Sequence, residues 1–125
     1  MNELDTLVAF VGCTDSAKAR AFYVDLLDLD LVSEDAFALV LRTGATIVRV
    51  QKLDKIVPQP FTVLGWQVHD IRIVAARLQR KGAVFERYKG MDQDQTGVWQ
   101  SPSGARIVWF KDPDGNLLSL TEISS

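Results

Sequence analysis

The stretch Phe110-Lys111-Asp112-Pro113-Asp114-Gly115-Asn116-Leu117-Leu118 joins two apolar runs across a turn. Proline presets the backbone for the second position of a turn, and Gly and Asn tolerate a positive φ angle. The apolar runs on either side have the length and composition of strands. The stretch therefore predicts a hairpin between strands at about 105–111 and 116–123.

The elements that precede this hairpin repeat in the same order in the first half of the chain. Each half starts with an apolar strand, at 7–12 and 61–68, and the residues Val8 and Val63 each precede an aspartate helix cap by seven positions. Apolar stripes with helical spacing then predict helices at 16–27 and 71–81. Further strands follow in each half: three in the first half, at 29–33, 37–42 and 46–52, and four in the second, at 84–88, 97–100, 105–111 and 116–123.

This repeat predicts an α+β fold built from two βαβββ modules. The modules cover about 5–54 and 61–123 and form a single domain over residues 1–125. A polar segment at 55–60, with two prolines, would link them.

The composition excludes several classes of protein. Of the 125 residues 47% are hydrophobic and 24% charged, which is typical of a globular domain, and the net charge of −2 gives no basic stripe for nucleic acid. No run is long enough to span a membrane, and the polar start of the chain is unlike a signal peptide. With Cys13 alone no intrachain disulfide can form. We therefore expect a cytoplasmic protein.

Two motifs in addition to the turn carry a family resemblance. The run Ala21-Phe22-Tyr23-Val24-Asp25-Leu26-Leu27-Asp28-Leu29 and the step Val68-His69-Asp70-Ile71 stand, with the run at 110–118, in the order found in one superfamily. The chain thus resembles the vicinal oxygen chelate superfamily, which includes glyoxalases, bleomycin-resistance proteins and extradiol dioxygenases. The resemblance covers nearly the whole chain and implies the same βαβββ modules. It does not imply one function, because the superfamily contains lyases, dioxygenases, epimerases and binding proteins.

The resemblance also implies that each sheet packs helices on one face and lines a pocket with the other. Strand alternation then assigns side chains to the two faces. If the more apolar sets pack against the helices, the pocket face carries Val8, Phe10, Arg49, Gln51, Val63, Gly65, Gln67, Ser119 and Thr121.

In the superfamily a divalent metal is held by one side chain from each of four strands. The motif register places these positions at Val8, Arg49, Val63 and Ser119. Two of these side chains are hydrocarbon, one is a cation, and a serine hydroxyl is a poor ligand by itself. We therefore expect no metal cofactor.

The resulting hypothesis is metal-independent binding of an anionic or aromatic small molecule, similar to bleomycin-resistance and related sequestering proteins. Arg49, Gln51 and Gln67 would orient the ligand, Phe10 and Trp99 would give apolar contact, and Ser119 would lie among them. One alternative is a lyase, isomerase or dioxygenase of the superfamily, with unusual metal ligands or with a Glu or Tyr in their place. Another is a module that binds a partner protein. Exposed sheet edges favour a homodimer.

Several residues allow a second interpretation. Arg49 could form a structural ion pair with an acid such as Glu86. Trp66 and Trp109 are expected in the core, or for Trp109 in a dimer interface. Glu86 and Tyr88 would share one strand face, where an acid/base role competes with an exposed or paired edge. The polar segment 91–95 is expected to be a hairpin tip or a pocket lid.

Overall fold

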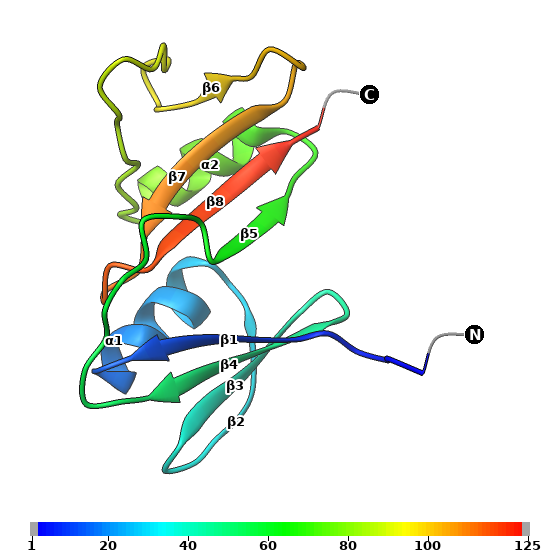
Figure 1. Cartoon of the computed structure of the whole chain (residues 1–125), viewed down its shortest axis with the longest axis vertical. Coiled ribbons are helices and arrows are strands. Elements are labelled where there is room, and N and C mark those ends of the chain that lie inside the picture. Colours follow the sequence, from blue (N-terminus) through cyan, green and yellow to red (C-terminus); the bar gives the residue numbers. More distant parts are fainter. Residues whose placement is uncertain (1–2, 124–125) are drawn as a thin grey trace. The chain divides into compact units, whose positions relative to one another are not determined.

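The computed structural model describes residues 3–123 and divides into two compact units that meet at Pro58 and Gln59. In the first unit the elements are β1 (Val8–Cys13), α1 (Ser16–Arg20), the π-helix η1 (Ala21–Leu26), β2 (Asp30–Glu34), β3 (Ala38–Thr43) and β4 (Thr46–Lys52). Its four strands form one sheet in the order β1-β4-β3-β2, with β1 parallel to β4 (Figure 1).

The second unit repeats this topology. Its elements are β5 (Leu64–Gln67), α2 (Ile71–Arg80), β6 (Trp99–Gln100), β7 (Arg106–Lys111) and β8 (Leu117–Glu122). They form a sheet in the order β5-β8-β7-β6, with β5 parallel to β8. The predicted pair of βαβββ modules is therefore confirmed.

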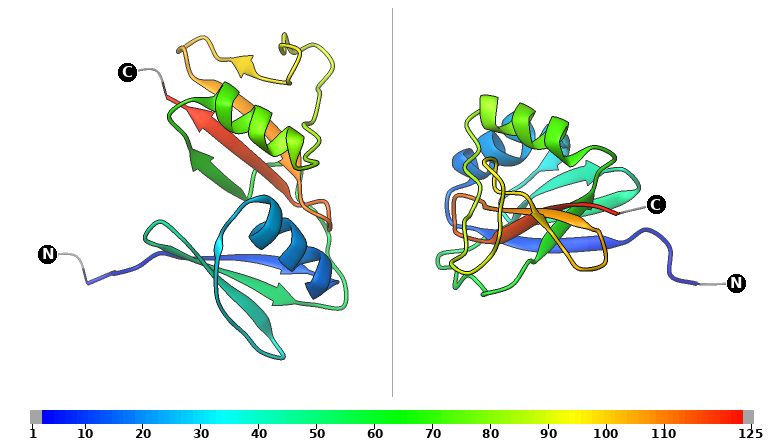
Figure 2. Two further views of the ribbon diagram at one scale, coloured as in Figure 1. Left: turned by 180° about the vertical axis from the view of Figure 1, so that it is seen from behind. Right: turned by 90° about the horizontal axis from the view of Figure 1, so that it is seen from above.

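Each sheet has its helix on one face and leaves the other face open. In the view from behind, α2 lies in front of its sheet, and α1 lies in front of β1 (Figure 2). The side chains of Val48, Val50, Val108 and Leu118 are fully buried on the helix faces. Helix α2 contributes Ile71, Ala75 and Leu78, as its apolar stripe predicts. The cores therefore lie between each sheet and its own helix.

The turn between β7 and β8 holds together through its own polar side chains. Asp112 Oδ1 accepts hydrogen bonds from the backbone N–H groups of Asp114 and Asn116, and Asn116 Nδ2 donates to Asp112 Oδ2 at 2.8 Å. Gly115 has the positive φ angle, 85°. The hairpin predicted from this stretch is confirmed, with Gly115 rather than Asn116 in the left-handed region.

Two predicted elements differ in the structure. The helix expected at 16–27 is present, but from Ala21 it continues as a π-helix, in which Leu27 N–H donates to the carbonyl of Phe22 five residues earlier. The prediction of a strand at 84–88 was wrong: Phe85 alone forms a bridge, to Phe110, and the Glu86 N–H donates to the Trp109 carbonyl. The Glu86 carbonyl and the Tyr88 N–H bond to the Gln93 side chain and not to a strand.

Within residues 3–123 no helix is long and apolar enough to cross a membrane.

Candidate functional site: the open faces of the two sheets

The open face of the first sheet carries the residues that alternation assigned to it. Strand pairing sets Phe10, Arg49 and Val40 side by side across β1, β4 and β3. The next row along the strands holds Gly12, Gln51 and Ala38. Phe10 is 56% exposed and Gln51 is exposed, whereas Val48 and Val50 on the opposite face are buried. The sequence thus predicted which way these strands face.

Arg49 is half-buried in an apolar row and has no ion pair with any residue of 3–58. The two ion pairs in residues 3–58 join Glu34 to Arg20 and to Lys52. Arg49 acts electrostatically on Asp35, whose carboxylate accepts hydrogen bonds from the backbone of Phe37 and Ala38. Those bonds lower the pKa of Asp35, and the charge of Arg49 lowers it further. Asp35 is therefore already engaged with the backbone.

One end of this face is covered by the segment that follows β4. A Cβ atom on Gly12 would clash with Ile56 Cδ1 and would lie 2.9 Å from Leu53 Cδ1. The backbone N–H of Leu53 also donates to the carbonyl of Cys13. Glycine at position 12 therefore lets these two side chains close over the end of β1. Phe10 and Arg49 lie earlier along β1 and β4 than the end that these two side chains cover.

The open face of the second sheet has a continuous row across all four strands. Pairing aligns Gln67 with Thr121, Thr121 with Ile107, and Ile107 with Trp99. The adjacent row contains Gly65, Ser119 and Trp109. Three of the predicted site residues, Gln67, Trp99 and Ser119, thus lie on this face.

Three aromatic rings gather on this second face. The ring centroids of Trp99 and Trp109 are 6.1 Å apart, and those of Tyr88 and Trp109 are 5.5 Å apart in an edge-to-face arrangement. We call Tyr88, Trp99 and Trp109 the aromatic wall. Trp109 was expected in the core or a dimer interface; its pairing with Ser119 places it on the open face, where it is partly exposed, so the core prediction is wrong and the interface stays a prediction. Trp66 lies on the helix face, as predicted.

Ser119 lies beside the aromatic wall with its hydroxyl over Gly65. The serine is 7% exposed, and a Cβ atom on Gly65 would lie 2.8 Å from Ser119 Oγ. Glycine at position 65 is thus required for this serine rotamer. The arrangement leaves a hydroxyl next to aromatic rings, where it can give a hydrogen bond to the edge of a bound molecule.

Glu86 and Tyr88 do not form an acid/base pair on one strand. Glu86 Oε1 lies 3.4 Å from Lys111 Nζ, so its carboxylate is paired within its own unit. Burial raises the pKa of the Tyr88 phenol, and the nearby charge of Glu86 raises it further. The phenol therefore stays protonated at neutral pH and can donate a hydrogen bond.

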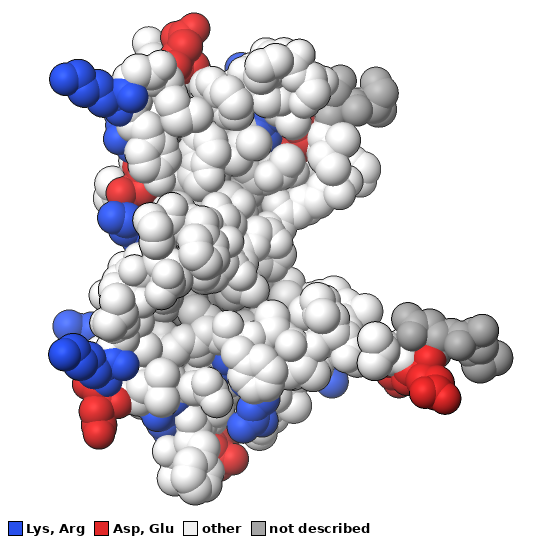
Figure 3. Space-filling model, viewed as in Figure 1, with Lys and Arg blue, Asp and Glu red and all other residues white. Residues whose placement is uncertain are grey.

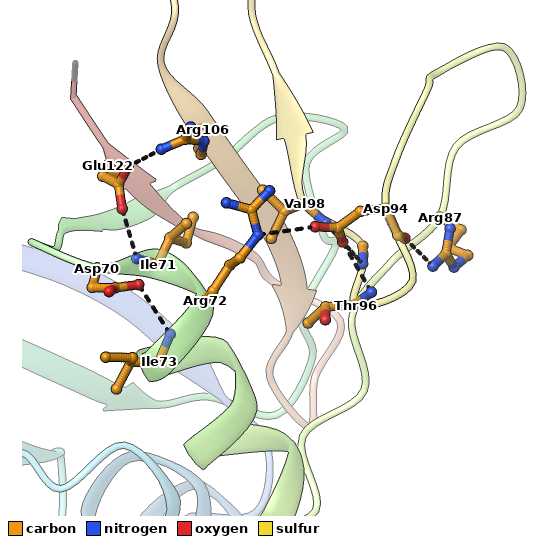
Figure 4. A network of polar contacts seen from close by, with 11 residues as sticks. Asp70, Ile71, Arg72, Ile73, Arg87, Asp94, Thr96, Val98, Arg106 and Glu122 are labelled. Atoms are coloured by element: carbon orange, nitrogen blue, oxygen red, sulfur yellow. Dashed lines mark hydrogen bonds and ion pairs between the residues drawn. The ribbon is translucent and has the colours of Figure 1, made fainter.

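A polar network fixes the loop that leads into β6 (Figure 4). Asp94 Oδ1 accepts hydrogen bonds from the backbone N–H groups of Thr96, Gly97 and Val98, and Asp94 Oδ2 lies 3.6 Å from Arg72 Nε. The Arg87 guanidinium donates to the Asp94 carbonyl. The segment 91–95 thus belongs to a tightly bonded loop.

The same figure shows how the start of α2 is bound to the last strand. Glu122 Oε1 accepts a hydrogen bond from the backbone N–H of Ile71, and Glu122 Oε2 lies 2.6 Å from Arg106 Nη1 (Figure 4). The Ile71 bond, and then Arg106, lower the pKa of Glu122. Asp70 Oδ1 caps the same helix end through the N–H of Ile73.

The predicted site residues therefore fall into two groups. Phe10, Arg49 and Gln51 lie together on the first sheet, and Gln67, Trp99 and Ser119 on the second. From the sequence, Tyr88 and Trp109 were considered but were not placed with Trp99 as ring contacts. Alternation places Trp109 on the same face of the strand as Ile107 but does not show which face of the sheet this is. The pairing of Trp109 with Ser119 in the hairpin shows that it is the open face.

Charged side chains are sparse on the open faces. In Figure 3, which shows the open faces, most of the visible atoms are uncharged, but Lys and Arg atoms lie over the first sheet as well as near Asp and Glu at the edges. In the part of the chain that the structure describes, no three His, Cys, Asp or Glu side chains gather as a metal-binding group. The predicted lack of a metal cofactor nevertheless stays a prediction.

Comparison with known families gives one match over most of the sequence. A sequence model of the Glyoxalase/Bleomycin resistance protein/Dioxygenase superfamily matches residues 4–120. No curated protein sequence matches the chain.

Solved structures of similar fold are numerous. A glyoxalase family protein from Bacillus anthracis aligns with a TM-score of 0.76 at 14% identity, over 99% of both chains. A superfamily member from Sphaerobacter thermophilus aligns with a TM-score of 0.73 at 23% identity, over 95% of this chain and 97% of that one. Lactoylglutathione lyase from Agrobacterium tumefaciens aligns with a TM-score of 0.72 at 17% identity, over 93% of this chain and 91% of that one. At these identities the likeness concerns the fold.

Proposed function

The chain belongs to the glyoxalase/bleomycin resistance protein/dioxygenase superfamily, and from this premise we propose that it binds a small anionic or aromatic molecule without a divalent metal. The observation that carries the proposal is the guanidinium of Arg49, held in a row with Phe10 and Val40 and without an ion pair among the described residues of its unit. Burying a charge among apolar side chains is costly unless an opposite charge pairs with it. A carboxylate, sulfonate or phosphate on a ligand would supply that charge.

The neighbours of Arg49 support an organic anion. Phe10 presents an exposed ring next to the guanidinium, and Gln51 offers an amide donor and acceptor in the adjacent row. A ligand held there would pair its charge with Arg49 and its hydrocarbon part with Phe10. This combination favours an organic acid over inorganic phosphate.

The second sheet supports the aromatic part of the proposal. Its aromatic wall is a surface for a planar ring, since rings stack or pack edge-to-face with Trp and Tyr. Ser119, Gln67 and Thr121 lie in the adjoining rows and could hydrogen-bond a heteroatom at the edge of such a ring.

The proposal excludes a metal because of the side chains at the superfamily's ligand positions. Val8 and Val63 have no donor atom, Arg49 is a cation that repels a metal ion, and Ser119 gives one neutral oxygen. Divalent ions in proteins take several donors, usually carboxylate, imidazole or thiolate groups. These four residues do not fit such an ion, and we derive no reaction step from one.

An enzyme of the same superfamily is the alternative, but the two groups that could act without a metal do not favour it. Tyr88 has a raised pKa and Glu86 is paired with Lys111, so neither is poised as a base at neutral pH. Binding, as opposed to catalysis, is therefore the function we propose. The homodimer and the cytoplasmic location expected from the sequence remain proposals beside it.

Calorimetric titration with 2-naphthoate tests the anionic part of this function. We expect Arg49→Ala to weaken binding about tenfold or more, because a charge-assisted hydrogen bond contributes about 1.5–3 kcal/mol. Arg42→Ala is the matched control, because it removes the same charge from the same face of the sheet. Arg42 is exposed and lies on β3, where it pairs with Ile47. Neutral 2-naphthamide should bind weakly, and with equal affinity, to wild type and to Arg49→Ala. Equal affinity of wild type and Arg49→Ala for 2-naphthoate would remove Arg49 from the site.

A further inference from the structure

The carboxamide of Gln93 makes three hydrogen bonds to the backbone of its own loop. Its Oε1 accepts from the N–H of Tyr88 at 2.8 Å. Its Nε2 donates to the carbonyl of Glu86 at 2.9 Å and to the carbonyl of Gly97 at 2.8 Å. Both amide hydrogens and the amide oxygen are thus used. Gln93 is partly buried and also forms a β-bridge with Trp99.

These bonds connect the segments that carry two rings of the aromatic wall. Trp109 lies on β7, which has a strand neighbour on each side. Trp99 lies on β6, a strand of only two residues, and Tyr88 lies in no strand. The chain before Tyr88 is attached to β7 through the Glu86 N–H, which donates to the Trp109 carbonyl. Beyond that point the backbone of residues 86–88 depends on bonds from its own loop.

We propose that Gln93 is a positioning residue for ring recognition: its carboxamide holds Tyr88 and Trp99 against Trp109 as one surface. The proposal rests on the proposed function for its ligand, a molecule with a planar ring. Gln93 does not touch that ligand; it acts through the backbone of Tyr88 and Gly97. Selectivity for a planar ring over a saturated one would then depend on Gln93, although Gln93 does not contact the ligand.

Other bonds in the loop do not replace this one. Asp94 closes the turn from Thr96 to Val98 and does not reach residues 86–88 with its carboxylate. The Arg87 guanidinium reaches the Asp94 carbonyl from an exposed side chain. Only Gln93, among the described residues, bonds through its side chain to the backbone on both sides of the loop.

The substitution Gln93→Glu tests the proposal with almost no change of shape. A carboxylate keeps the oxygen that accepts from Tyr88 but loses both donors. It then directs a second oxygen at the carbonyls of Glu86 and Gly97, and acceptors facing one another repel. Gln95→Glu is the matched control, because Gln95 lies in the same loop, is exposed and receives the same charge.

Two measurements report on the arrangement of the aromatic wall independently of the overall stability of the protein. The first is the far-ultraviolet circular dichroism couplet of the paired indoles, which Trp99→Phe identifies. The second is the affinity for neutral 2-naphthamide relative to cyclohexanecarboxamide, which has a saturated ring; neither molecule carries a charge for Arg49. In Gln93→Glu we expect the couplet to be lost and the preference for the naphthyl ring to fall about threefold to tenfold, the worth of an aromatic contact. Gln95→Glu should keep both.

The outcomes separate this inference from the proposed function. An unchanged couplet in folded Gln93→Glu would overturn the role of Gln93, whatever the affinities. A wild type that shows the couplet but binds neither amide would contradict the aromatic part of the proposed function alone. If Gln93→Glu does not fold, amide hydrogen exchange of wild type decides: Tyr88 N–H should exchange far more slowly than the neighbouring Lys89 N–H. Equally fast exchange would show that Gln93 does not hold this segment.

Discussion

Replacing Asp94 separates two interactions that meet on one side chain. Its Oδ1 accepts three backbone N–H groups at 2.9–3.0 Å, and its Oδ2 approaches Arg72 at 3.6 Å. Asp94→Ala removes both interactions. Asp94→Asn keeps an oxygen for the N–H groups and removes only the ion pair. Comparing the two variants therefore shows which interaction stabilises the loop before β6.

The expected magnitudes differ clearly. Loss of a carboxylate that caps backbone N–H groups costs about 0.5–2 kcal/mol at helix ends, and we expect the upper part of that range for three N–H groups in Asp94→Ala. The ion pair is exposed on both sides, with side-chain exposures of 58% for Arg72 and 35% for Asp94. Such pairs contribute about 0–1 kcal/mol, so Asp94→Asn should lose less.

Urea unfolding followed by tryptophan fluorescence measures the difference. With a slope of about 1–3 kcal/mol per molar urea, Asp94→Ala should lower the midpoint by roughly 0.5–1 M. Asp94→Asn should lower it by less than half as much. Equal losses in the two variants would show that the Arg72 ion pair, and not the bonds to Thr96, Gly97 and Val98, stabilises the loop.

Two further predictions concern the second unit. In Gly65→Ala the new Cβ would lie 2.8 Å from Ser119 Oγ, so unfolding free energy should fall by about 1–3 kcal/mol. Adding Ser119→Ala should recover part of this loss in a urea titration, and strictly additive losses would contradict the contact. The pKa of Glu122 lies below its ordinary 4.5 because of the Ile71 N–H and then Arg106. A carboxyl with a lowered pKa in the folded state contributes stability above pH 4.5 that is lost as the pH falls through the folded pKa. The difference in Tm between wild type and Glu122→Gln should therefore shrink on acidification, and a constant difference would count against this role.

Much of the fold follows from local sequence because the deciding signals repeat. The turn at 112–116 contains the side chains that close it, and each aspartate that caps a helix follows a valine, Val8 or Val63, by seven residues. The strand expected at 84–88 failed for a nonlocal reason. Its backbone groups bond to the Gln93 side chain, and no property of residues 84–88 indicates that competition.

The candidate site was predictable where alternation alone decides. Arg49 and Gln51 point away from Val48 and Val50 as any strand requires, so their face followed from the core. Trp109 was not predictable in this way, because Ile107 and Trp109 are as apolar as Val108 and Phe110. Its face depends on pairing with Ser119 across the hairpin. The contribution of Tyr88 depends on a loop conformation, which periodicity does not describe.

Metal content and ligand binding measured on the same sample test the central claim most directly. Protein purified without chelator would be analysed for divalent ions and then titrated with 2-naphthoate before and after treatment with EDTA. Metal-independent binding predicts less than stoichiometric metal and an unchanged affinity after chelation. A stoichiometric divalent ion whose removal abolishes naphthoate binding would contradict it.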